Sequence, residues 1–106
     1  MTIEWLAAAK DDLQEIAQWV VSKFGYDIAE QTVADIVAET NRLAFFPEMG
    51  RQCYHGSRHA FRAIHTHNNR IVYTITDKYV LIVAVFDNRR NPSFLTRLLQ
   101  KRDVSF

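Results

Sequence analysis

The sequence contains few of the features that mark secreted, membrane-bound or disordered proteins. It has one cysteine, Cys53, so it cannot form an internal disulfide, which agrees with a reducing compartment. Its three glycines and two prolines are too few for a low-complexity chain. Its longest apolar run, residues 79–86, is much shorter than the roughly 20 residues that cross a bilayer, and the amino terminus has no basic region followed by an apolar run. We therefore expect a folded cytoplasmic protein with no membrane contact.

Charge is unevenly distributed along the chain, although the formal net charge is only +1. Residues 1–50 contain three basic and nine acidic residues, a net charge of −6, whereas residues 51–106 contain ten basic and three acidic residues, a net charge of +7. The second half is therefore a basic surface, which attracts either phosphate groups or an acidic protein segment. The two halves could also attract each other within the fold, and composition alone does not choose among these possibilities.

Two helices are predicted in the first half of the chain. After a short strand at residues 3–6, apolar residues recur at helical spacing through residues 9–24, with polar residues between them. Gly25 is expected to cap the carboxyl end of this helix, and Asp27 followed by Glu30 is typical of a capping box at the start of the next. The second helix ends before Pro47. The very short turn between the two helices predicts a helical hairpin.

The second half changes to the period of about two that is typical of strands. Residues 47–57 contain proline and glycine breakers and are predicted to form a loop, in which Gly50 and Gly56 can adopt positive φ. Strands begin at Phe61, with turns predicted at Asn68-Asn69 and Asp77-Lys78. The nearly continuous apolar run at 79–86 predicts a central strand that is covered on both faces.

The order of these elements predicts an α+β fold. Asn91 followed by Pro92 is a favourable start for a short final helix. The complete order is then βααβββα, in which an N-terminal strand and a helical hairpin pack on a small antiparallel sheet with a short C-terminal helix. With 106 residues, of which 48% are hydrophobic, the chain is large enough for one domain spanning residues 1–106 and too short for two.

Four groups of residues, taken in order, match a known family. They are Trp5, Ala9, Asp12-Leu13 and Ile16 near the start, Pro47–Arg51 in the loop, Phe61-Arg62 with Arg70–Tyr73 on paired strands, and Ile82–Pro92 on the last strand and its exit. Together they resemble the RelE/ParE toxins of type II toxin–antitoxin systems, and the resemblance covers roughly residues 3–102. The resemblance implies the βααβββα fold, a toxin without a cofactor, and a cognate antitoxin protein that wraps the toxin with an extended or helical segment.

This family divides according to the cellular target of the toxin. ParE-like members act on DNA gyrase and are not known to need a catalytic set, whereas RelE-like members are ribosome-dependent endoribonucleases that cut mRNA. In an alignment without gaps, two arginines that are important in the RelE group fall on Arg70 and Arg90. Arg62 or His65 could act as helpers in a shifted geometry, since a histidine titrates near neutral pH. The tyrosine and two lysines of that group, which belong to its acid–base set, fall on Thr96, Phe61 and Ala63.

The exit of the last strand favours the ParE-like group, because Arg89-Arg90-Asn91-Pro92 is closer to the Arg-Arg-Asp pattern of that group. We therefore expect a gyrase-directed toxin, with a RelE-like mRNA endoribonuclease as the alternative and a non-toxic binding domain of the same fold as a third hypothesis. As a toxin, the chain is expected to bind its antitoxin through Arg62, Arg89 and Arg90, which can form paired hydrogen bonds with carboxylates. As a ribonuclease, it would bind the scissile phosphate with Arg70 and Arg90. The same arginines could instead be solvated or salt-bridged strand residues.

Several other side chains have structural interpretations. His65 and His67 lie two residues apart on one predicted strand face, but no third ligand is evident, so no metal site is expected. Cys53 is expected to be a small buried side chain. The aromatic residues Trp5, Trp19 and Tyr73 are expected in the core, and the histidines at 55 and 59 on the surface. The cluster Arg97, Lys101 and Arg102 is expected to favour the negative end of the last helix.

Overall fold

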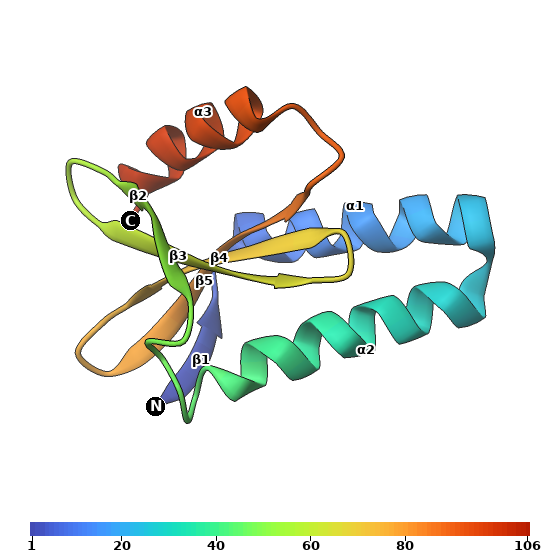
Figure 1. Cartoon of the computed structure of the whole chain (residues 1–106), viewed down its shortest axis with the longest axis horizontal. Coiled ribbons are helices and arrows are strands. Elements are labelled where there is room, and N and C mark those ends of the chain that lie inside the picture. Colours follow the sequence, from blue (N-terminus) through green and yellow to red (C-terminus); the bar gives the residue numbers. More distant parts are fainter.

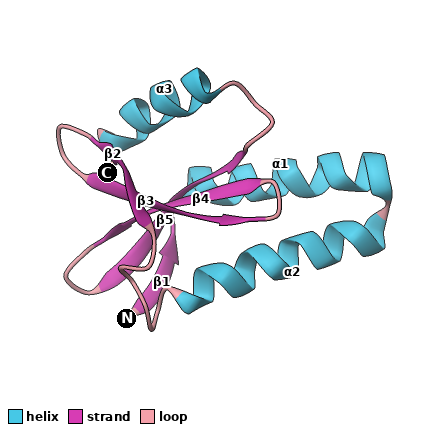
Figure 2. Cartoon of the chain, viewed as in Figure 1, coloured by secondary structure: helices cyan, strands magenta, loops and turns pink.

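The computed structural model describes all 106 residues and places two helices on one face of a five-stranded sheet and one helix on the other face (Figure 1; Figure 2). None of the helices is long and apolar enough to span a membrane. The predicted α+β class is confirmed, with one strand more than expected. The elements are β1 (Thr2–Trp5), α1 (Ala7–Phe24), α2 (Tyr26–Arg42), β2 (Arg51–His55), β3 (Ala60–Thr66), β4 (Asn69–Ile75), β5 (Tyr79–Asp87) and α3 (Pro92–Asp103).

The sheet has the order β1-β5-β4-β3-β2. Strands β3 to β5 form the antiparallel sheet that was expected, and β2 extends it as an additional antiparallel strand. Strand β1 pairs with β5 in the parallel direction, so the sheet is mixed. The long crossover through the rest of the chain allows this parallel pairing, which a short hairpin connection would not. The predicted central strand β5 is confirmed, since residues 80–86 are all buried.

The two faces of the sheet form two apolar clusters. On one face, Ala9 of α1 and Ile36 of α2 pack on alternate residues of β3, β4 and β5, including the fully buried Tyr73. On the other face, Leu95 and Leu99 of α3 pack on Phe61, Val72 and Phe86. With 12 residues, α3 is shorter than α1 and α2, which have 18 and 17.

The predicted loop at residues 47–57 contains a strand, β2, which the sequence analysis missed. Four of the five residues in β2 are exposed, so this edge strand has no alternation of apolar and polar residues. Its pairing with β3 also shifts register between Gln52 and Tyr54. The expectation of positive φ at Gly50 and Gly56 is wrong, because among the glycines only Gly25 has a positive φ.

The two glycines beside β2 are needed for close approach. A Cβ atom at Gly50 would lie 2.5 Å from the hydroxyl of Tyr73, and one at Gly56 would lie 2.3 Å from Oδ2 of Asp103. The Tyr73 hydroxyl accepts a hydrogen bond from the Gly50 N–H at 2.9 Å and donates one to the Pro47 carbonyl at 2.7 Å. A buried side chain of the sheet therefore holds the segment that leads into β2.

The turn between α1 and α2 is confirmed at Gly25, whose φ of 90° is accessible to glycine at little cost. The capping box is wrong, because Gly25 serves both helices and no side chain caps the start of α2. Asp27 therefore falls inside the first turn of α2 instead of preceding the helix. The end of the hairpin extends past the sheet in Figure 1, and the side chains of Phe24 and Tyr26 there are 61% and 77% exposed.

Two further local predictions are close to the structure. The β3–β4 turn lies one residue earlier than expected, at His67 and Asn68, because Thr66 pairs with Asn69. His67 has a φ of 51° and its Nε2 lies 2.6 Å from a carboxylate oxygen of Asp35 on α2, so it does not share a strand face with His65. The start of α3 is confirmed, since the Asn91 side chain accepts a hydrogen bond from the Ser93 N–H and Pro92 begins the helix.

The last residue of α3, Asp103, is buried and binds the β2–β3 turn. Its carboxylate accepts hydrogen bonds from the Ser57 hydroxyl and from the N–H groups of Arg58 and His59. The His59 ring lies 3.0 Å from the same carboxylate and stacks on Phe106, so His59 is not the free surface residue that was expected. Burial raises the pKa of Asp103, but these hydrogen bonds outweigh it and lower the pKa from 3.8 to about 2.

Asp103→Asn is expected to lower the melting temperature at pH 7 by an amount on the order of 5 °C, since the uncharged amide cannot replace all of these contacts. Because the folded-state pKa is depressed, the contribution of Asp103 to stability is complete above about pH 4 and disappears as the pH falls through about 2. Thermal unfolding followed by circular dichroism between pH 2 and 7 should show the wild type and the variant converging at the acid end. A constant difference across this range would contradict the prediction.

Candidate functional site

The arginines singled out by the sequence lie within β3 (Arg62), near the start of β4 (Arg70) and just after β5 (Arg89 and Arg90), and the structure holds each of them differently. Arg89 follows β5 and is fixed by its neighbours. Its Nε and Nη2 donate to the two carboxylate oxygens of Asp87 at 2.9 and 2.8 Å. The guanidinium also lies 4.0 Å from the ring centre of Trp19 on α1. The hydrogen bond from Arg89 lowers the pKa of Asp87 and, in turn, raises the pKa of Arg89.

Trp19 is therefore a partly exposed support for Arg89 rather than the core residue that was expected, with 37% of its surface accessible. Its indole ring also makes an edge contact with Phe24. The pairing with Asp87 occupies two of the five donors of Arg89 and leaves the others free for a ligand. Arg89 can thus contribute to binding in one fixed orientation.

Arg90 makes no ion pair and packs on aromatic rings instead. Its guanidinium carbon lies 5.5 Å from the ring centre of Phe86 and 5.7 Å from that of Phe94. The guanidinium carbon of Arg97, one turn further along α3, lies 5.1 Å from the ring centre of Phe94. Phe94 is 49% exposed. An accessible aromatic ring is therefore flanked by two guanidinium groups whose charges are unpaired in the protein.

These residues form one wall of an open groove of about 750 Å³ between α1, the end of β5 and α3, which we call the basic groove. Arg90, Arg97 and Lys101 contribute unpaired positive charges, and Phe86, Phe94 and Leu98 contribute apolar surface. Glu15 is an unpaired acid of the opposite wall. The full lining is Asp12, Glu15, Phe86, Arg90, Phe94, Arg97, Leu98, Gln100, Lys101, Arg102 and Val104.

The wall of the basic groove is held by an ion pair between Asp12 of α1 and Arg102 of α3. The two guanidinium nitrogens of Arg102 lie 2.5 and 2.9 Å from the carboxylate of Asp12, and both side chains are largely buried. The pair also binds the part of β5 that follows the end of its pairing with β1. Asp12 accepts a hydrogen bond from the Val85 N–H, and Arg102 donates one to the Val83 carbonyl. The ion pair therefore supplies hydrogen-bond partners for two backbone groups of β5 that have no neighbouring strand on that side. At this point the acidic and basic halves of the chain do attract each other.

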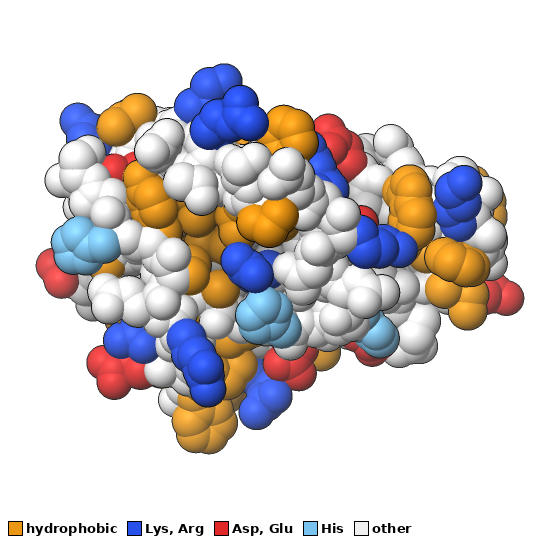
Figure 3. Space-filling view, turned by 45° about the horizontal axis from the view of Figure 1, so that its top comes forward, with side chains coloured by type: hydrophobic (Ala, Val, Ile, Leu, Met, Phe, Trp, Pro, Cys, Tyr) orange, Lys and Arg blue, Asp and Glu red, His pale blue; other side chains and the backbone are white.

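Arg70 and His65 lie near the basic groove, on the same face of the sheet. They are directly opposite each other on β4 and β3, and Arg70 is also opposite Phe86, the ring on which Arg90 packs. The Nε atom of Arg70 is buried without a hydrogen-bond partner. The structure therefore places Arg70 between His65 and Phe86 across the sheet, and Arg90 packs on Phe86 from beyond the end of β5. Figure 3 shows a histidine next to a basic side chain on the surface of the protein.

Arg62 is separated from this group. It pairs with Tyr73 in the β3–β4 register and so projects from the opposite face of the sheet from Arg70. Its Nη1 donates to the backbone carbonyls of Glu48 at 3.2 Å and Gly50 at 2.8 Å. It stabilises the segment before β2, and it cannot assist Arg70 and Arg90 in acid–base chemistry without a large movement.

Cys53 was expected to be buried, but the structure places it in an exposed position on β2. It lines a hollow of about 520 Å³ together with Arg51, His65 and Arg70. Partial burial of the thiol raises its pKa more than the nearby Arg70 lowers it. The thiol is therefore protonated at neutral pH and is a poor nucleophile. No group of three or more His, Cys, Asp or Glu residues in the protein could hold a metal ion.

The contribution of α3 to the basic groove was not predicted from the sequence. Phe94, Arg97 and Lys101 are spaced by three and four residues, which places them on one face of a helix. This spacing was present in the sequence, but Arg97 and Lys101 were interpreted only as partners of the helix dipole. The same applies to Arg102, whose partner Asp12 is 90 residues away.

The chain is similar to known toxins in both sequence and fold. The family model described as the ParE toxin of type II toxin–antitoxin system, parDE, matches residues 3–92. Among solved structures, one chain of the chromosomal ParDE toxin–antitoxin system from P. aeruginosa is similar with a TM-score of 0.69 and 18% identity, covering 82% of this chain and 95% of that chain. At this identity the likeness shows the fold alone. No curated protein matches the sequence significantly.

Proposed function

The chain belongs to the ParE toxin family of type II toxin–antitoxin systems, and from this premise we propose that it stops growth in the cytoplasm by binding DNA gyrase and is neutralised by a cognate antitoxin. The observation that carries the proposal is the basic groove, a binding surface with unpaired cations and an accessible aromatic ring but few groups for acid–base chemistry. Such a surface suits the recognition of a protein with acidic segments.

The chemistry around Arg70 and Arg90 supports binding over RNA cleavage. Cleavage by a 2′-oxygen needs a general base, a general acid and cations near the phosphate. Of the two residues directly opposite Arg70, only His65 has a side chain that can exchange a proton, since the other is Phe86. The positions where the RelE group carries lysines hold Phe61 and Ala63, which are buried in the apolar cluster beneath α3.

An mRNA endoribonuclease remains the second candidate function because of one specific observation. Arg70 has a buried Nε without a partner and lies between His65 and Phe86 across the sheet, and Arg90 packs on the same Phe86 ring. Two arginines and a histidine on one open face are able to hold a phosphodiester. Under this hypothesis Arg70 and Arg90 bind the phosphate, His65 exchanges the proton, and the partners are the ribosome and mRNA.

For the antitoxin, we propose contacts at Arg90 and at the free donors of Arg89. Arg90 lies in the basic groove, and Arg89 is fixed beside it by Asp87 and Trp19. Arg62 is a more distant contact, because its Nη1 is bound to backbone carbonyls and only its other nitrogens are available to a carboxylate. An antitoxin segment that reached all three would extend around the edge of the sheet.

The two candidate functions predict different first effects when the chain is expressed alone in bacteria. With gyrase as the target, incorporation of labelled thymidine is expected to fall within minutes, while incorporation of labelled methionine continues. Replacing both Arg70 and His65 with alanine should then leave toxicity unchanged, because neither side chain lies in the basic groove. An early loss of methionine incorporation that disappears in the double variant would establish the ribonuclease instead.

A further inference from the structure

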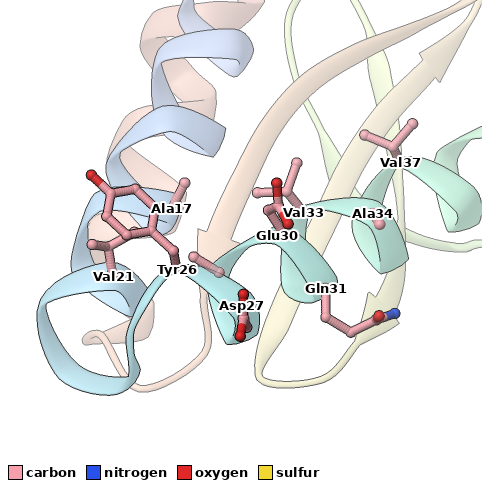
Figure 4. Close-up of a pocket in the computed structure, with 10 residues that line it drawn as sticks. Ala17, Val21, Tyr26, Asp27, Glu30, Gln31, Val33, Ala34 and Val37 are labelled. Carbon is pink, nitrogen blue, oxygen red and sulfur yellow. The ribbon is translucent and has the colours of Figure 1, made fainter.

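The two largest hollows of the molecule differ in charge. The hollow of about 800 Å³ between α1 and α2 is mostly apolar, and its two ionised residues, Asp27 and Glu30, are both acidic (Figure 4). The basic groove has four basic and two acidic residues. Because Asp12 and Arg102 neutralise each other, its three exposed cations are opposed by a single acid, Glu15. A polyanion is therefore attracted to the basic groove and repelled by the hollow between the helices.

The exposed ring of Phe94 is a second feature of the basic groove. The guanidinium carbons of Arg90 and Arg97 lie 5.7 and 5.1 Å from its ring centre, further than the 4.0 Å that separates the guanidinium of Arg89 from the ring centre of Trp19. The ring of Phe94 thus has cations beside it and still keeps 49% of its surface accessible. It is able to accept a planar group from a ligand.

The ring and the cations follow one another along the groove. Phe94, Arg97 and Lys101 are spaced by three and four residues, so they share one face of α3, and Arg90 precedes this helix. At 1.5 Å per residue, the row from Phe94 to Lys101 is roughly 10 Å long, about the length of three nucleotides at 3.4 Å each. A nucleic acid strand alternates bases with phosphates in the same way. The cations attract any acidic partner, and the ring adds a preference for one that carries planar groups.

We propose that the basic groove binds single-stranded DNA, with one base stacked on Phe94 and the adjacent phosphates paired with the three cations. Duplex DNA is a poorer ligand for the ring because its bases are already stacked inside the helix. The choice of DNA over RNA rests on the proposed function, since gyrase is an enzyme that acts on DNA. An acidic antitoxin segment in the same groove would exclude the DNA, because its carboxylates would take the places of the phosphates.

The probe for the test is a fluorescein-labelled oligothymidylate of 12 nucleotides, and its binding to the purified chain is followed by fluorescence anisotropy at several salt concentrations. The logarithm of the binding constant is expected to fall with the logarithm of salt with a slope of roughly −2, because each of three phosphates contributes about −0.7. Arg97→Gln with Lys101→Gln should reduce this slope to roughly −0.7. The matched control, Lys23→Gln with Lys78→Gln, removes two exposed charges outside the groove and should leave the slope unchanged.

Stacking is tested by Phe94→Ala, which should weaken binding of the oligothymidylate about tenfold while leaving the salt slope unchanged. Phe94→Trp should retain the affinity, because an indole ring also stacks on bases. Phe45→Ala removes a ring that is 81% exposed and lies outside the groove, so it should have no effect. Binding of a 12-base-pair duplex should be equal in the wild type and in Phe94→Ala.

Three results would overturn the proposal. The first is the absence of saturable binding, or an affinity for the oligothymidylate that Phe94→Ala does not change. The second is an equal loss in Phe94→Ala for a peptide of ten glutamates, which would assign the ring to protein recognition. The third is tighter binding of oligouridylate than of oligothymidylate, which would favour the mRNA endoribonuclease. These measurements use the purified chain without gyrase, so their failure is distinct from a failure of the thymidine experiment in cells.

Discussion

Replacing Asp12 with alanine is expected to lower the free energy of unfolding by about 3 kcal/mol or more, the largest effect on stability that we predict for a single substitution. The side chains of Asp12 and Arg102 retain only 16% and 12% of their exposure. Removing the carboxylate leaves a buried guanidinium without its counterion, and the Val85 N–H at the edge of β5 without its acceptor. Both costs arise in the folded state alone. Urea unfolding followed by circular dichroism measures the loss directly.

Two controls distinguish this ion pair from a general effect of truncation. Glu15→Ala removes an exposed carboxylate from the same helix and should change stability by no more than about 0.5 kcal/mol. The double variant Asp12→Ala with Arg102→Met removes both charges and should be less destabilised than Asp12→Ala alone, because no unpaired charge remains. A double variant that is clearly less stable than the single one would show that the pair itself, and not the orphaned guanidinium, carries the energy.

The elements that the sequence predicted well are those whose burial repeats with a regular period. Helices α1 and α2 have apolar residues at helical spacing, and β5 is buried along nearly its whole length, so each pattern has a single interpretation. Strand β2 was missed because its exposed edge position leaves no alternation. The parallel pairing of β1 was missed because it depends on a partner about 77 residues away, Tyr79 opposite Thr2, and no local pattern encodes that choice.

The candidate site was predicted in its residue types but not in its arrangement. The resemblance to the toxin family directed attention to Arg62, Arg70, Arg89 and Arg90. Their environments depend on residues that are distant in the sequence, such as Trp19 beneath Arg89 and the backbone of Gly50 beside Arg62. The sequence could not show that Arg89 is fixed while Arg90 is free. That difference, together with the exposed Phe94, is the basis on which we propose the basic groove as the partner-binding surface.

The double substitution Arg90→Glu with Arg97→Glu is expected to have the largest effect on partner binding. Both guanidinium groups flank Phe94 and neither has an ion-pair partner within the chain, so the fold does not need their charges. A hydrogen bond to a charged group contributes about 1.5–3 kcal/mol. Losing two such contacts should therefore weaken antitoxin affinity by roughly a hundredfold or more. Isothermal titration of the purified variant with the proposed cognate antitoxin measures this change.

A matched control reverses two charges elsewhere, at Lys23 and Lys78, which are exposed and lie outside the basic groove. It changes the net charge of the chain by the same amount and should retain nearly all of the affinity if the groove is the binding surface. The conservative variant Arg90→Lys with Arg97→Lys should have an intermediate affinity, because lysine keeps the charge but not the paired hydrogen bonds of arginine. Equal losses in the control and in the glutamate variant would mean that the antitoxin responds only to overall charge. An unchanged affinity in the glutamate variant would place the antitoxin on another surface of the toxin.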